Sequence, residues 1–160
     1  MKFPIFFLLA AISSASFSDA NDVSYKAFME IITDEHRIGV FKGYVESIEK
    51  NLPLAEGGDS AAMFRLYENF NLLAHIHKIE GASENAIYWL RQSAVLRHTE
   101  ALKTLGHIYK NGNKTFNIEK NLERAAEYFK LAWEQGDTSG KFHYMDIIEC
   151  ELPDEKAWDC

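Results

Sequence analysis

Apolar residues recur three and four positions apart along most of the chain, which is the spacing of one face of an α-helix. In the middle of the chain they are Leu102, Leu105, Ile108 and Tyr109, followed by Ala125, Tyr128, Phe129 and Ala132. No stretch sustains the alternation of apolar and polar residues that is typical of a strand. The pattern therefore predicts an all-α protein.

The same pattern returns after a fixed number of residues, which is the separation in sequence between Ala62 and Ala101. We call this separation the repeat offset. By this offset Leu66 and Phe70 fall on Leu105 and Tyr109, and Ala86, Trp89 and Leu90 fall on Ala125, Tyr128 and Phe129. A third copy begins with Gly140, Tyr144 and Ile148 and then stops. The small residues let paired helices approach closely. The period predicts helix pairs that stack, because one pair alone leaves an apolar face exposed.

Residues suited to helix ends flank these segments. Ser60 and Ser83 can cap the helices of the first copy, and Thr99 and Asn121 can cap those of the second. Gly81, Gly112 and Gly136 suit the left-handed positions that end helices. Residues 21–58 precede the repeats and carry two helical stripes, which fit either one bent helix or two helices. We expect them to form a helical N-terminal cap.

Residues 101–136 resemble the Sel-one-like repeat family, a relative of the tetratricopeptide repeats. A-L-K-T-L-G-H-I-Y-K-N-G (101–112) matches the family's A-x-x-x-L-G-x-x-Y-x-x-G helix, and N-L-E-R-A-A-E-Y-F-K-L-A-W-E-Q-G (121–136) is close to its second helix. The first copy keeps the aromatic and alanine positions but has Tyr67 where the family has glycine. The resemblance implies a short α-solenoid of antiparallel helix pairs over residues 59–149, with about two repeats and a half-repeat, and a protein-binding role.

The first residues follow the order of a secretory signal peptide. Lys2 precedes an apolar run over residues 3–12, and small residues follow at 13–16. The run is shorter than the roughly 20 residues that a transmembrane helix needs, so we expect cleavage, with Ala20 the favoured position, and no membrane insertion afterwards. The alternative is an N-terminal core helix. Cleavage predicts a periplasmic or secreted protein with residues 1–20 removed.

Charge and cysteine content narrow the partners and the compartment. The formal net charge of −7 argues against binding nucleic acid or an anionic membrane and favours a basic protein partner. Both cysteines, Cys150 and Cys160, lie at the C-terminus. In an oxidising compartment they predict a disulfide that pins the tail of residues 150–160. A reactive thiol is the alternative, but no histidine or lysine pattern accompanies it.

No pattern of residues indicates catalysis or a cofactor. His75 and His77 are two apart, so on a helix they point to different faces and predict no metal site. Nucleophile-elbow, phosphate-loop and dinucleotide-binding motifs are absent from the sequence. The sequence therefore predicts a protein that is not an enzyme and that needs no cofactor or metal.

The repeat offset also aligns polar and aromatic positions between the core residues into three ladders across successive first helices. The ladders are Phe64, Lys103 and Phe142; Arg65, Thr104 and His143; and Glu68, His107 and Asp146. In family members such positions line a concave groove. We expect this one to bind protein, because it mixes aromatic rings with both charge signs. The alternative is that Phe64 and Phe142 belong to the core.

Three functions fit these features. The first is an exported protein-binding module, in its sharper form an immunity protein that neutralises a secreted antibacterial effector, which would be a basic toxin. The second is a scaffold subunit of an envelope assembly or a host-directed secreted factor. The third is a cell-wall or β-lactam hydrolase, as in cysteine-rich members of the family. Those members carry a cysteine pair in each repeat, which this chain lacks.

Overall fold

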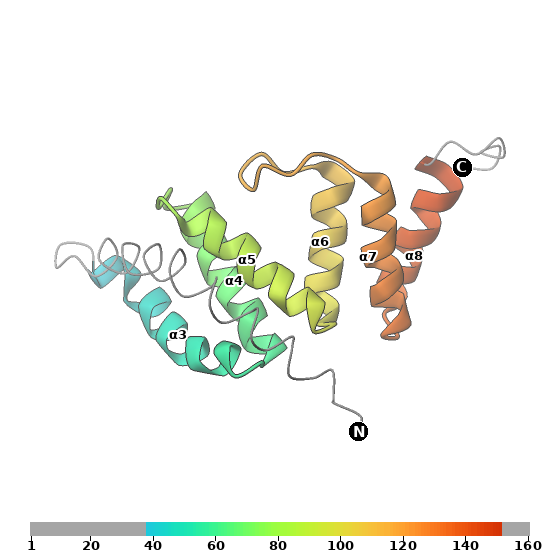
Figure 1. Cartoon of the computed structure of the whole chain (residues 1–160). Helices are drawn as coiled ribbons and strands as arrows, with labels where there is room; N and C mark the ends of the chain where they lie inside the picture. The colour runs from blue at the N-terminus through green and yellow to red at the C-terminus, as the bar shows by residue number, and fades with distance from the viewer. Residues whose placement is uncertain (1–37, 152–160) are drawn as a thin grey trace, which may run out of the picture.

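Helices follow one another along the chain and lie side by side (Figure 1). The computed structural model describes residues 38–151. Its helices are α3 (Ile38–Glu56), α4 (Ser60–His75), α5 (Ala82–Val95), α6 (Thr99–Asn111), α7 (Leu122–Glu134) and α8 (Thr138–Asp146), and the π-helical turn η1 (Ile147–Glu151) follows. The predicted signal peptide, residues 21–37 and Cys160 lie outside the described residues.

Each helix packs on its neighbours in the chain, with the closest association between α4 and α5 and between α6 and α7. The prediction of an all-α fold, built as a short α-solenoid of antiparallel helix pairs, is confirmed. Helix α3 forms the helical cap at the N-terminal side of the pairs, where it packs on α4. Within residues 38–151 the one strand-like feature is an isolated bridge between Asn113 and Ile118.

The buried core includes most of the positions that the repeat offset aligns. The small residues Ala62, Ala101, Ala86 and Ala125 are all fully buried. Leu66 and Leu105 are likewise buried, and so are the larger Phe70 and Tyr109 that follow them. Each buried Leu or Phe contributes about 1.5–3 kcal/mol relative to an exposed one. Apolar burial at matched positions therefore stabilises the two helix pairs in the same way.

Three turns, separated from one another by the repeat offset, share one hydrogen-bond pattern. After α3, α5 and α7 the backbone has a positive φ at Gly58 (94°), Arg97 (58°) and Gly136 (89°). At each of them the N–H donates to the carbonyl three residues earlier, and the next N–H donates to the carbonyl five residues before it. This is the Schellman motif. The end of the N-terminal cap therefore repeats the turns that follow α5 and α7.

The helix caps differ in part from the sequence prediction. Asn121 caps α7 as predicted, since its side chain accepts a hydrogen bond from the Arg124 N–H. The predicted caps Ser60, Ser83 and Thr99 are wrong, because these residues already lie inside α4, α5 and α6. The actual cap residues are Asp59, Gly81 and His98. At α4 the carboxylate of Asp59 accepts from two helix N–H groups, which a serine one residue later cannot do.

The middle turn places an arginine where the other two have glycine. Side chains with a Cβ are strained at positive φ, so we expect Arg97→Gly to raise the free energy of unfolding by about 1 kcal/mol. The exposed ion pair of Arg97 with Glu134 offsets little of this gain. The reciprocal change, Gly136→Arg, is expected to lower stability by a similar amount. Urea denaturation measures both; opposite signs support the shared turn, and a destabilised Arg97→Gly protein contradicts it.

Candidate protein-binding surface

The nine predicted ladder residues lie on α4, α6 and α8, and we call the surface that they form the first-helix face. The exposed members are Arg65, Glu68, His107, Phe142 and Asp146, and the half-buried members are Phe64, Lys103, Thr104 and His143. The hydroxyl of Thr104 donates to the Glu100 carbonyl of its own helix. The residues therefore divide into a group that a partner can reach and a group that joins the helices.

Contacts between successive first helices run diagonally and not along the predicted ladders. The ring of Phe64 stacks on His98, the cap residue of α6, with centroids 5.0 Å apart. At the equivalent position of the next repeat, Lys103 forms an ion pair with Asp137, the cap residue of α8 (Nζ to Oδ2 3.1 Å). Equivalent positions in successive repeats therefore form an aromatic stack between Phe64 and His98 and an ion pair between Lys103 and Asp137.

Lys103 and Asp137 stabilise each other's charged state. The Lys103 ammonium also contacts Glu100 at 2.7 Å. The hydrogen bond to Glu100 raises the pKa of Lys103; burial opposes it, and the bond to Asp137 adds to the rise. Burial works to raise the pKa of Asp137, but hydrogen bonds from the Gly140 N–H and from Lys103 outweigh it, so that pKa is lowered. At neutral pH this cluster links α6 to the start of α8.

Two histidines and a buried ring join the same two helices further along. His107 and His143 lie edge to face with centroids 4.6 Å apart. Both rings contact Phe129 of α7, at 5.0 Å and 4.8 Å, and Phe129 is fully buried. Although its side chain is exposed overall, partial burial of the ring lowers the pKa of His107, and the neighbouring His143, Lys110 and Lys103 lower it further. Phe129 therefore supports part of the first-helix face from below.

These pKa shifts predict that mild acid lowers the stability of the fold. Burial lowers the pKa of His98 as well as that of His107 below the ordinary value of 6.5, although nearby carboxylates partly offset the shift at His98. Above that value both rings are neutral in the folded and unfolded chain. As the pH falls below 6.5, these histidines take up protons more readily in the unfolded chain than in the folded chain. The free energy of unfolding therefore decreases until the pH lies below the lowered pKa values of the folded chain.

We therefore expect a lower melting temperature at about pH 5.5 than at about pH 7.5. The double variant His98→Gln/His107→Gln should show a smaller difference between the two conditions. Differential scanning calorimetry at matched ionic strength measures it. Equal pH dependence in the two proteins would contradict the assignment.

Phe64 and Phe142 have different environments despite their matched positions. Phe64 packs against the hydrophobic core and on His98, as the core alternative implies. Phe142 is 70% exposed. The difference has a simple cause, because the position of Phe64 is covered by the start of the next first helix, and α8 is followed by no further pair in residues 38–151. Phe142 thus offers a large apolar contact at the end of the first-helix face.

Sequence reasoning missed residues that shape this surface. Lys110 forms an ion pair with Asp146 at 2.7 Å, which joins α6 to α8. Lys110 lies three residues after His107 and therefore on the same face of α6, and this spacing could have indicated its place on the surface. The role of Asp137 was not visible from the ladders, because it lies five residues before Phe142 in a turn. Cys150 is disulfide-bonded, and its predicted partner Cys160 lies outside the described residues.

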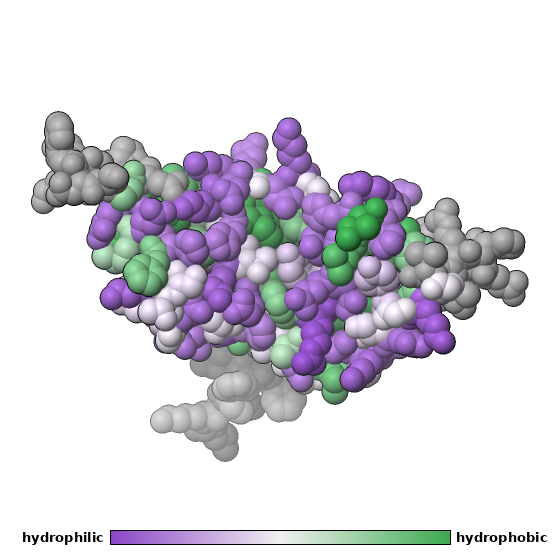
Figure 2. All heavy atoms as spheres, turned by 180° about the vertical axis from the view of Figure 1, so that it is seen from behind, coloured by the Kyte–Doolittle hydropathy of each residue, from purple (hydrophilic) through white to green (hydrophobic). Residues whose placement is uncertain are grey.

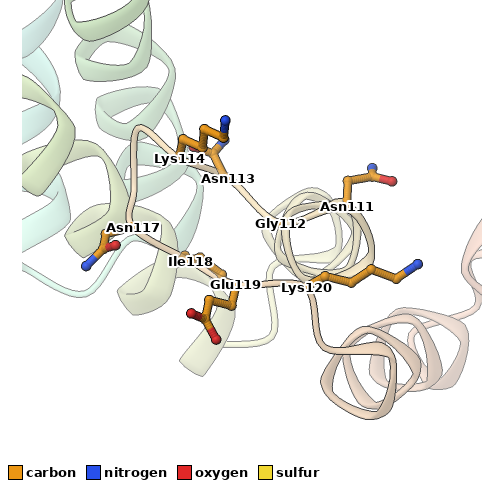
Figure 3. Close-up of a pocket in the computed structure, with 8 residues that line it drawn as sticks. All are labelled: Asn111, Gly112, Asn113, Lys114, Asn117, Ile118, Glu119 and Lys120. Atoms are coloured by element: carbon orange, nitrogen blue, oxygen red, sulfur yellow. The ribbon is translucent and has the colours of Figure 1, made fainter.

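The connection between α6 and α7 folds back as a small hairpin. The N–H of Asn113 donates to the Ile118 carbonyl (2.7 Å) and the N–H of Ile118 to the Asn113 carbonyl (2.9 Å). Its tip residue Phe116 is buried against His75 at the end of α4. A cavity of about 500 Å³ lies at the base of the hairpin, but Figure 3 shows the side chains that line it fanning outward. They do not converge on a common ligand position.

The surface viewed from behind in Figure 2 is largely hydrophilic, with hydrophobic side chains in separate spots. Residues 38–151 contain no helix that is long and apolar enough to cross a membrane. Among the same residues, no three His, Cys, Asp or Glu side chains gather as a metal site would require. Comparison with family models, with curated proteins and with solved structures finds nothing that matches this chain.

Proposed function

We propose that this chain is an exported protein-binding module that acts without catalysis. The observation that carries the proposal is the first-helix face, where α4, α6 and α8 present both charge signs beside the exposed ring of Phe142. Protein interfaces favour aromatic anchors surrounded by polar groups. The supporting ion pairs and the buried Phe129 hold this face in a fixed shape, which lowers the entropy lost on binding.

The resemblance to Sel-one-like repeats is part of this proposal. Three equivalent turns separated by the repeat offset support a repeat origin, and relatives of this kind serve as binding scaffolds. A repeat stack exposes one row of helices to a partner while the other row provides support. Export to the periplasm or the medium follows from the predicted signal peptide.

The sharper form of the proposal is an immunity protein for a secreted antibacterial effector. The net charge of −7 favours a basic effector, because opposite charges speed association. We expect association to slow as the salt concentration rises. The purified chain should also inhibit the activity of the captured effector in stoichiometric amounts.

Affinity capture from envelope and secreted extracts tests the proposal. The face variant Arg65→Ala/His107→Ala/Phe142→Ala removes three exposed side chains of the first-helix face. The control variant Lys42→Ala/Glu46→Ala/Lys50→Ala removes three exposed side chains from α3. Circular dichroism checks that both fold. We expect the native chain and the control to retain one basic protein in stoichiometric amounts and the face variant to lose it; retention by all three would contradict the proposal.

A further inference from the structure

A groove lies between the second helices of the two pairs, α5 and α7, and is separate from the first-helix face. Its volume is about 480 Å³. The residues that line it include Arg91, Val95, Arg97, Leu102, Tyr128 and Leu131. Leu102 of α6 is almost fully buried. The groove therefore combines an apolar base with two guanidinium groups.

The charge of this groove is opposite to that of the chain as a whole. Three of the five arginines in the sequence, Arg91, Arg97 and Arg124, belong to α5, the turn after it, and α7. Burial raises the pKa of Tyr128, and the neighbouring Tyr109 and Glu127 raise it further, whereas the positive charges of Arg91 and Arg124 lower it. In a protein of net charge −7, a local cluster of this kind selects anionic groups.

Both guanidinium groups of the groove retain hydrogen-bonding capacity. Arg91 is exposed and has no ion-pair partner among residues 38–151. Arg97 donates one N–H to Glu134 at 3.3 Å, and a guanidinium carries five N–H donors in total. Arg97 is about half exposed in this ion pair. The ion pair with Glu134 thus leaves other N–H donors of Arg97 available to a ligand carboxylate.

Exposed apolar side chains occur in the groove, at Val95, and next to it in the sequence, at Leu96. Val95 is 74% exposed and Leu96 is 47% exposed, and the two follow each other directly before Arg97. Such residues give an incoming apolar side chain a contact surface beside the guanidinium groups. The combination fits a segment in which an apolar residue lies between carboxylates.

The backbone at Arg97 is a second and independent observation. Two of the three equivalent turns have glycine at positive φ, and the third has Arg97, whose side chain is strained there. Among the described residues, Lys78 and Asn117 also have a positive φ, but Arg97 is the one of these three non-glycine residues that lines the groove, and strained backbone is enriched at ligand-binding positions. Because Arg97 lines the groove, the role that we consider is contact of its guanidinium with a ligand.

We infer that the α5/α7 groove binds an acidic segment of a protein partner, with an apolar side chain over Leu102 and Leu131 and carboxylates on Arg91 and Arg97. This surface is additional to the first-helix face, which presents both charge signs, and it selects an acidic ligand. A partner with both a basic region and an acidic segment engages both surfaces.

Fluorescence anisotropy with defined peptides tests this inference on the purified chain. The probe is a labelled peptide with a Leu-Phe centre flanked by aspartate and glutamate. Two matched peptides replace either the acidic flanks by lysine or the Leu-Phe centre by Gly-Ser. We expect the probe to bind in a salt-sensitive manner and each matched peptide to bind at least about tenfold more weakly.

Arg97→Gly separates loss of binding from loss of folding, because it relieves strain in the turn while it removes the guanidinium. We expect this variant and Arg91→Ala each to weaken probe binding by about tenfold, with Lys50→Ala on α3, where the side chain is exposed, as an unchanged control. Equal affinity for the lysine-flanked peptide, or native affinity in Arg97→Gly, would overturn the inference. The inference would also be overturned if the native chain associated with itself and Arg97→Gly abolished this association, because the groove would then bind a second copy of the chain. Each result is independent of the first-helix variants.

Discussion

Replacing Phe129 by alanine is expected to destabilise the protein by about 3–5 kcal/mol, which is the range for removal of a fully buried aromatic ring. Phe129 is completely buried and contacts both His107 and His143. Its removal leaves a cavity at the junction of α6, α7 and α8. The rings above it then lose their support, so the first-helix face should lose its fixed shape.

Equilibrium urea denaturation gives the free energy of unfolding for this comparison. Trp133→Ala on the same helix is a matched control, because its ring is 39% exposed and its loss should be much smaller. Phe142→Ala should change stability by no more than about 0.5 kcal/mol, since the side chain is 70% exposed. A Phe129→Ala protein as stable as the Trp133→Ala protein would contradict the packing described for α6, α7 and α8.

Replacing Gly140 by alanine is expected to lower the free energy of unfolding by about 1–3 kcal/mol, although alanine is the better helix former. A Cβ at this position would lie 2.9 Å from the carbonyl oxygen of Phe129, from the backbone nitrogen of Trp133 and from the Cβ of Ala132. Backbone atoms cannot move aside as a flexible side chain can. The substitution therefore pushes α8 away from α7.

Gly43→Ala provides the opposite result in the same assay. Position 43 lies within α3, and a Cβ there meets nothing within 4 Å. Alanine in an open helical position should stabilise the protein by about 0.5–1 kcal/mol. If Gly140→Ala stabilised the protein as Gly43→Ala does, the close approach of α7 and α8 would be wrong.

The periodic features of this fold could be predicted from the sequence. Apolar spacing alone indicated the all-α class, and the repeat offset aligned Ala62 with Ala101, which are both fully buried. Asn121 was recognised as a cap because an asparagine before an apolar helical run has a local signature. Each of these features depends on residues that are near in sequence or that repeat.

Other features depend on geometry that no local pattern encodes. Arginine has no preference for positive φ, so the turn at Arg97 is apparent only by comparison with Gly58 and Gly136. The diagonal contact of Phe64 with His98 depends on how neighbouring helix pairs are placed against each other, which the period alone does not define. The exposure of Phe142 depends on its place after the last helix pair of the described residues.

Photo-crosslinking in living cells tests the central claim most directly, namely that the first-helix face binds a protein partner. A photoreactive phenylalanine analogue replaces His107 or Phe142 on this face and, as a control, the exposed Lys50 on α3. We predict that irradiation links positions 107 and 142 to the same protein and leaves position 50 unlinked. Crosslinks of equal yield at all three positions, or at position 50 alone, would contradict the claim.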